Sequence, residues 1–86
     1  MDIDVVSVRR VDGDGNLKAF VDVRLGGEIV VKGFSVMHGK NGVFVSMPRR
    51  AGRDGRWFDI LSPLDESWKS RLEEKVLAAY EEGPAA

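Results

Sequence analysis

The sequence predicts an α+β domain: an antiparallel β-meander of about five strands over residues 3–61, followed by one C-terminal amphipathic helix over residues 63–82 that packs on the sheet. Three observations predict this fold class. Val-rich and alternating apolar runs fill most of the chain, with glycine-rich turns between them. The turns are short, which favours antiparallel pairing because parallel strands need long crossovers. Near the C-terminus the apolar spacing changes from two residues to four, as in a helix.

The 86 residues suffice for a single domain, residues 1–86, in which residues 83–86 form a short tail. Hydrophobic residues make up 43% of the chain and charged residues 31%, as in ordinary globular domains. A chain this short buries only about 60–65% of its unfolded surface, so its core is thin. We therefore expect a homodimer that pairs through free sheet edges, since association adds buried area and satisfies those edges.

The first two strands are predicted from their apolar patterns. Ile3–Arg10 is Val-rich, and its alternation slips between Val5 and Val6, which predicts a bulge. The Asp-Gly pairs of Asp12–Asn16 suit the positive φ angles of a turn. Leu17–Leu25 then alternates apolar and polar residues without a break over nine positions, which predicts a strand with one buried face.

Three shorter strands complete the predicted meander. The third covers Glu28–Met37, and Gly33 within it predicts a bulge or a close approach of another segment. The fourth covers Val43–Met47 and stops at Pro48, because proline cannot donate a backbone hydrogen bond. The fifth covers Trp57–Leu61.

The predicted helix carries one apolar stripe, with residues four positions apart. The stripe consists of Trp68, Leu72, Val76 and Tyr80. Ser62 can cap a helix that begins at Pro63, or Asp65 can cap one that begins about a turn later. Gly83 and the proline after it predict the end of the helix.

Several classes of protein and site are excluded by composition. The chain has no Cys, which excludes disulfides, thiolate catalysis and cysteine-ligated metals, and its one His cannot build a multi-His site. No apolar run approaches the roughly 18–20 residues needed to cross a bilayer, and the acidic N-terminus has no apolar signal segment. We expect a cytoplasmic protein without cofactor, metal, membrane partner or small-molecule substrate.

Candidate catalytic residues are few. His38 has no nucleophile motif near it, and we interpret it as a turn or surface residue. Asp12 and Asp14 lack the later ligands and the terminal Glu of a calcium loop. The sequence therefore predicts no enzyme; a polar cleft around His38 and Asp59 would be needed to support one.

The one concentrated feature follows Pro48. Residues 49–56 hold four arginines and one aspartate, a local charge of +3. The arginines are Arg49, Arg50, Arg53 and Arg56. Guanidinium groups match phosphate oxygens two at a time, so these four are predicted to bind DNA or RNA. The alternative is a solvated turn whose arginines pair with the acidic C-terminal helix.

Trp57 and Phe58 directly follow the arginines. One of these rings could stack on an unpaired base, but taken singly each ring is expected in the core. Residues 62–86 carry three basic and six acidic side chains. A helix of this charge is unsuited to a DNA groove, which argues against a recognition helix.

These residues resemble the SpoVG family of bacteria (stage V sporulation protein G) over roughly residues 3–83. The stretch Asn41–Pro48, which reads N-G-V-F-V-S-M-P, is the most specific match. The other matching segments are Val8–Val11, Gly15–Ala19, Arg49-Arg50, Asp54-Gly55 and Phe58–Ile60.

The resemblance implies a small cytoplasmic regulator linked to septum formation, cell division and sporulation. Several members of the family bind DNA and also RNA, and its members resemble dimers that pair through their sheets. The resemblance attributes nucleic-acid contact to the basic residues after the Met-Pro pair, here Arg49 and Arg50. Arg53 and Arg56 extend this site on physical grounds alone. The near-neutral net charge of −1 supports an alternative function, a protein-interaction module that acts on division or regulatory proteins without nucleic-acid contact.

Overall fold

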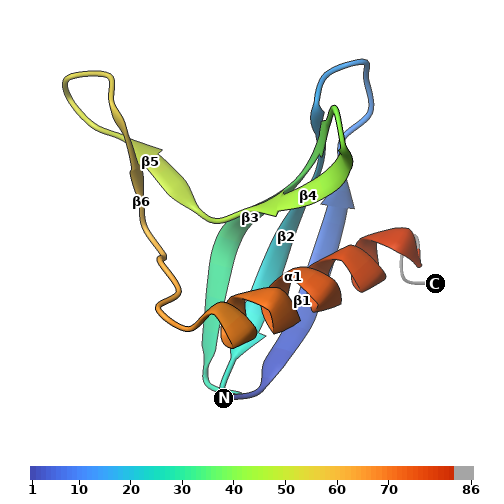
Figure 1. Cartoon of the computed structure of the whole chain (residues 1–86), viewed down its shortest axis with the longest axis vertical. Helices are drawn as coiled ribbons and strands as arrows, with labels where there is room; N and C mark the ends of the chain where they lie inside the picture. The colour runs from blue at the N-terminus through green and yellow to red at the C-terminus, as the bar shows by residue number, and fades with distance from the viewer. Residues whose placement is uncertain (83–86) are drawn as a thin grey trace.

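The computed structural model describes residues 1–82, and six strands and one helix follow one another within them (Figure 1). The elements are β1 Ile3–Arg10, β2 Leu17–Leu25, β3 Ile29–Gly39, β4 Gly42–Ser46, β5 Arg49–Ala51, β6 Trp57–Asp59 and α1 Glu66–Glu81. The first four strands form one antiparallel sheet in the order β1-β2-β3-β4, and α1 crosses one face of it. The predicted α+β class, a strand meander followed by one helix, is confirmed.

The last predicted strand pairs differently from the expectation. It does not extend the four-stranded sheet; as β6 it pairs with β5, a strand that the sequence did not predict. Figure 1 shows this β5–β6 hairpin projecting away from the sheet. The radius of gyration of 13.1 Å agrees with that projection, since a compact domain of this length is expected near 12 Å.

The core lies between the sheet and α1. The alternation of β2 is confirmed, because Ala19, Val21, Val23 and Leu25 are buried while Phe20 and Arg24 are exposed. Within residues 1–82 the buried core cluster consists of Ile3, Ala19, Val21, Val23, Leu25, Phe34, Val36, Val45, Leu72 and Val76. Trp68 and Tyr80 pack partly buried against this core, so the predicted helical stripe is confirmed as well.

Both predicted irregularities of the sheet are present. The pairing of β1 with β2 shifts between Val5 and Ser7, and Val6 is exposed. In β3 the register shifts next to Gly33. The φ angle of Gly33 is +103°, a backbone conformation that residues with a Cβ rarely adopt. A Cβ on Gly33 would lie 3.6 Å from the Cβ of Pro48. This bulge therefore passes close to Pro48, the buried residue from which the hairpin departs.

The helix begins at the later of the two positions that the sequence allowed. Asp65 is the N-cap, and its Oδ1 accepts hydrogen bonds from the Ser67 backbone N at 2.9 Å and from the Ser67 hydroxyl at 2.8 Å. The expected start at Pro63 is therefore wrong, because the cap that forms belongs to Asp65. At the other end the helix stops at Glu81, and the predicted Gly83 stop lies outside the described residues.

The Asp65 cap predicts an acid-dependent part of the stability. The hydrogen bonds from Ser67 hold the pKa of the Asp65 carboxyl below its ordinary value of 3.8. A depressed folded-state pKa stabilises the fold above pH 3.8, and that contribution is lost as the pH falls through the lower folded-state value. Asp65→Asn keeps a capping oxygen that does not titrate. The difference in melting temperature between wild type and this variant should therefore shrink on acidification below about pH 4.

This expectation is checked by thermal unfolding of both proteins, followed by circular dichroism, from about pH 6 down to about pH 3. Glu74→Gln is the control, because Glu74 is an exposed carboxylate on the same helix, away from the cap. A melting-temperature difference between wild type and Asp65→Asn that stays constant over this range would contradict the assignment.

Candidate nucleic-acid interface

The four arginines lie on the β5–β6 hairpin and on the loop at its tip. The register pairs Arg49 with Asp59, Arg50 with Phe58, and Ala51 with Trp57. Side chains alternate between the two faces of a strand, whereas paired residues share a face. Arg49 and Trp57 therefore lie on one face of the hairpin, and Arg50 and Phe58 lie on the other.

The loop at the tip is ordered mainly by its own backbone. The Gly52 N–H donates to the Arg56 carbonyl at 2.7 Å, and the Gly55 N–H donates to the Gly52 carbonyl at 3.1 Å. Asp54 Oδ1 accepts from the Arg56 backbone N at 3.1 Å. The ring of Phe58 covers Gly52 so closely that a Cβ there would collide with it. These contacts hold the turn without using a guanidinium group of Arg50 or Arg53.

Two of the four arginines form ion pairs, and both partners belong to the hairpin. Arg49 Nε lies 3.1 Å from Asp59 Oδ1, and Arg56 Nε lies 3.4 Å from Asp54 Oδ2. Within residues 1–82, Arg50 and Arg53 have no carboxylate oxygen within 4.0 Å. The alternative of pairing with the acidic helix is therefore wrong for the described chain. Exposed pairs of this kind contribute about 0–1 kcal/mol, so a phosphate can compete for their arginines.

The hairpin is exposed throughout. Every residue from 49 to 60 is exposed except Gly52, which is half-buried. Trp57 is 60% exposed and Phe58 is 53% exposed, so the expectation that each ring belongs to the core is wrong. The rings are left uncovered because the hairpin leaves the sheet and its two strands pack mainly on each other.

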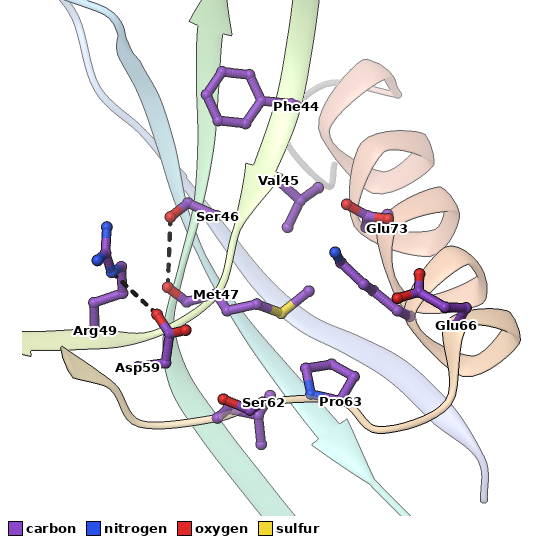
Figure 2. Close-up of a pocket in the computed structure, with 12 residues that line it drawn as sticks. Phe44, Val45, Ser46, Met47, Arg49, Asp59, Ser62, Pro63, Glu66 and Glu73 are labelled. Atoms are coloured by element: carbon purple, nitrogen blue, oxygen red, sulfur yellow. Dashed lines mark hydrogen bonds and ion pairs between the residues drawn. The ribbon is translucent and has the colours of Figure 1, made fainter.

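A groove of about 500 Å³ lies between β4 and the beginning of α1. Figure 2 shows the Arg49–Asp59 ion pair on one side of this groove and the carboxylates of Glu66 and Glu73 on the helix at the other side. The groove also contains Lys69, so its walls carry both signs of charge. This mixture suits a phosphate backbone less well than the exposed hairpin does.

The basic residues that end β1 are used within the fold. Arg9 forms an ion pair with Asp22 at 3.3 Å, and its guanidinium lies 6.0 Å from the centre of the Phe20 ring. Arg10 stacks 4.5 Å from the centre of the Tyr80 ring and donates to the Tyr80 carbonyl. These contacts attach β1 to its neighbours, which leaves the hairpin as the main group of projecting cations.

His38 and Asp59, the pair on which an enzyme would depend, lie in different surroundings. Asp59 lines the groove of Figure 2, whereas His38 is an exposed residue of β3 that does not line it. Among residues 1–82, no group of three or more His, Asp or Glu side chains is placed to hold a metal ion. The helix α1, the one helix among the described residues, does not meet the length and hydrophobicity of a membrane span.

The sequence profile of the SpoVG family matches residues 1–82, a range that includes the whole sheet, the hairpin and α1. The chain belongs to the SpoVG family. One member, named "Putative septation protein SpoVG 1" in Listeria monocytogenes, is 40% identical over 81 residues, which cover 94% of this chain and 79% of the relative. SpoVG proteins of Acetivibrio thermocellus and Clostridium acetobutylicum are each 36% identical over 81 residues, covering 94% of this chain and 86% and 85% of the relatives.

The stretch Asn41–Pro48, on which the resemblance was mainly based, forms one continuous part of the fold. It forms the turn before β4, β4 itself, and the exit from the main sheet. Val45 from this stretch belongs to the core, and Pro48 is buried where the hairpin begins. The backbone N–H of Ile60 donates to the Pro48 carbonyl at 2.9 Å and closes the base of the hairpin. Asn41–Pro48 thus determines the point at which the hairpin leaves the main sheet.

Proposed function

We propose that this member of the SpoVG family binds DNA or RNA through the β5–β6 hairpin and acts as a regulator in septation and in sporulation-type gene regulation. The observation that supports the binding proposal is the grouping of four exposed arginines on one projecting hairpin. Two of them, Arg50 and Arg53, have no carboxylate partner among residues 1–82. The names of the relatives support the role in septation.

Binding of this kind is directed mainly at phosphates. The hairpin residues 49–59 carry four arginines and two aspartates, a net charge of +2, while the chain as a whole carries −1. Attraction is therefore local, and the acidic helix stays away from the polyanion. Contacts with phosphate set affinity and orientation but carry little sequence information. We expect salt-sensitive binding with modest sequence preference.

We further propose that the protein acts as a homodimer paired through a sheet edge. The four-stranded sheet ends in β1 on one side and β4 on the other, and each of these strands pairs with only one neighbour within residues 1–82. Pairing of one such edge with a second copy satisfies its backbone groups. A dimer presents two arginine hairpins, and linked sites raise the effective affinity without any new type of contact.

The double variant Arg49→Ala/Arg50→Ala tests the proposed interface. Its affinity for fluorescently labelled duplex DNA and single-stranded RNA should fall about tenfold or more at low salt, because two charge-assisted contacts to phosphate are removed. Fluorescence anisotropy titrations at a fixed salt concentration measure the change.

The matched control is Lys40→Ala/Arg71→Ala, which removes two positive charges at exposed positions outside the hairpin. It should bind almost as tightly as wild type if the hairpin is the site, and it corrects for the change in net charge. Equal affinities of wild type and the Arg49/Arg50 variant would reject the hairpin as the nucleic-acid interface.

One observation favours a second candidate function, the docking of a protein partner. An apolar groove of about 370 Å³ lies beside the start of α1, and its wall residue Leu64 is fully exposed. Exposed apolar surface of this kind often marks protein contacts. Flat nucleic-acid titrations, together with recovery of a division or regulatory protein from nuclease-treated lysate, would favour this function over the first.

A further inference from the structure

A third concave region, a hollow of about 430 Å³, lies between the hairpin and the face of the sheet that α1 does not cover. Its floor contains Phe20, Ser35 and Ser46, which stand opposite one another on β2, β3 and β4 and therefore form one row across the sheet. Phe20 points away from the core, since its neighbours Ala19 and Val21 are buried.

The hairpin supplies the other wall of this hollow. Arg49 and Trp57 share one hairpin face, and both line the hollow. Gly33 also borders it, beside Pro48, and a Cβ at this position would lie 3.6 Å from the Cβ of Pro48. Two aromatic rings, two hydroxyl groups and one guanidinium therefore surround a space that is open to solvent.

This set of groups matches the parts of an unpaired nucleotide. A base has a flat π surface that stacks on Trp or Phe, and polar edges that exchange hydrogen bonds with hydroxyl groups. The phosphate attached to it is an anion that Arg49 can bind, and Arg50 and Arg53 lie on the same hairpin for the adjoining phosphates. Bases within a duplex are stacked on one another and cannot enter such a hollow without being flipped out.

We propose that this hollow receives an unstacked base of a single-stranded nucleic acid, with Trp57 on the wall as the stacking surface and Phe20 on the floor. The proposal rests on the proposed function and deepens it, because it makes single strands the preferred ligand and separates two roles within one hairpin. The arginines supply attraction to any polyanion, and Trp57 supplies the preference for an exposed base.

The test compares Trp57→Ala with wild type on three probes of about 12 units each, oligo(dT), oligo(rU) and a duplex DNA. Affinity for both single strands should fall about tenfold, since one base–aromatic stack is lost, while affinity for the duplex should change by less than about twofold. Trp57→Phe should recover most of the loss, because it restores an aromatic face. Binding of oligo(dT) should also quench the emission of Trp57 in wild type.

Ile60→Ala is the matched control. Ile60 is 63% exposed and Trp57 is 60% exposed, but Ile60 follows the end of β6 and does not line the hollow. Its removal should leave all three affinities unchanged. Salt provides a second readout: Trp57→Ala should lower single-strand affinity by the same factor at every salt concentration, whereas Arg49→Ala/Arg50→Ala should make the salt dependence shallower.

The outcomes separate this proposal from the one on which it rests. If Trp57→Ala behaves like Ile60→Ala while the Arg49/Arg50 variant loses affinity, the base-binding proposal is wrong and the phosphate-binding function stands. If Trp57→Ala instead weakens self-association and lowers single-strand and duplex binding alike, a second copy occupies the hollow and the proposal is overturned. If wild type binds none of the probes, both proposals fail.

Discussion

Replacing Leu72 with Ala is expected to lower the free energy of unfolding by about 2–5 kcal/mol. Leu72 is fully buried in the middle of the helical stripe, where it packs against the nine other residues of the core cluster found within residues 1–82. The substitution removes apolar contacts and leaves a cavity that the surrounding strands cannot fill completely. The free energy of unfolding of a domain is roughly 5–15 kcal/mol, and small domains lie low in that range. The substitution is therefore expected to remove a large part of the total stability.

Chemical denaturation followed by circular dichroism measures this loss, and Glu74→Ala is the control on the exposed face of the same helix. The control should stay within about 0.5 kcal/mol of wild type. If the Leu72 variant also stayed within that margin, α1 could not be packed on the sheet as described.

The affinity of the protein for duplex DNA is expected to fall steeply as the salt concentration rises. If each hairpin contacts about three phosphates and the dimer presents two hairpins, six contacts give a slope of about −5 in a plot of log affinity against log salt for duplex DNA. Affinity should then fall about a thousandfold or more between 50 and 200 mM salt. A monomer with three contacts gives a slope of about −3 and a fall of only about fortyfold.

Anisotropy titrations at four or five salt concentrations give the slope, and sedimentation equilibrium under the same conditions gives the mass. Arg49→Ala/Arg50→Ala should bring the dimer's slope to about −2, since four of six contacts are lost. A single species of 9.5 kDa at tens of micromolar would contradict the dimer, and a slope near zero would contradict phosphate binding altogether.

Much of the fold follows from short-range patterns in the sequence. The alternation along β2 and the four-residue spacing of the helical stripe each specify one buried face, and the buried residues agree with both. The bulge at Gly33 was predictable because glycine inside a strand leaves few alternatives. The start of α1 was ambiguous because Ser62 and Asp65 are both good N-caps, and the choice between them depends on the path of the loop.

The surroundings of the arginines were less predictable. Grouping of the four cations is visible in the sequence, but the pairing of Arg49 with Asp59 depends on the register of a hairpin whose strands are only three residues long. Trp is a residue type that is usually buried in the core. Trp57 is exposed because the chain leaves the main sheet at Pro48. Phe20 and Trp57 line the same hollow only because of the tertiary structure, since the two residues are far apart in the sequence.

Because the chain leaves the main sheet at Pro48, the hairpin can change in sequence independently of the core. None of the side chains between Arg49 and Ile60 belongs to the core that holds the sheet and helix together. Substitutions of these side chains are therefore nearly neutral for the fold of the sheet and helix, provided that Pro48 and Gly33 keep the exit path and the tip glycines Gly52 and Gly55 are kept. The ligand preference of the hairpin can therefore change during evolution while the sheet and helix stay the same. A new recognition segment could also be engineered in place of the hairpin with little effect on the stability of the rest of the molecule.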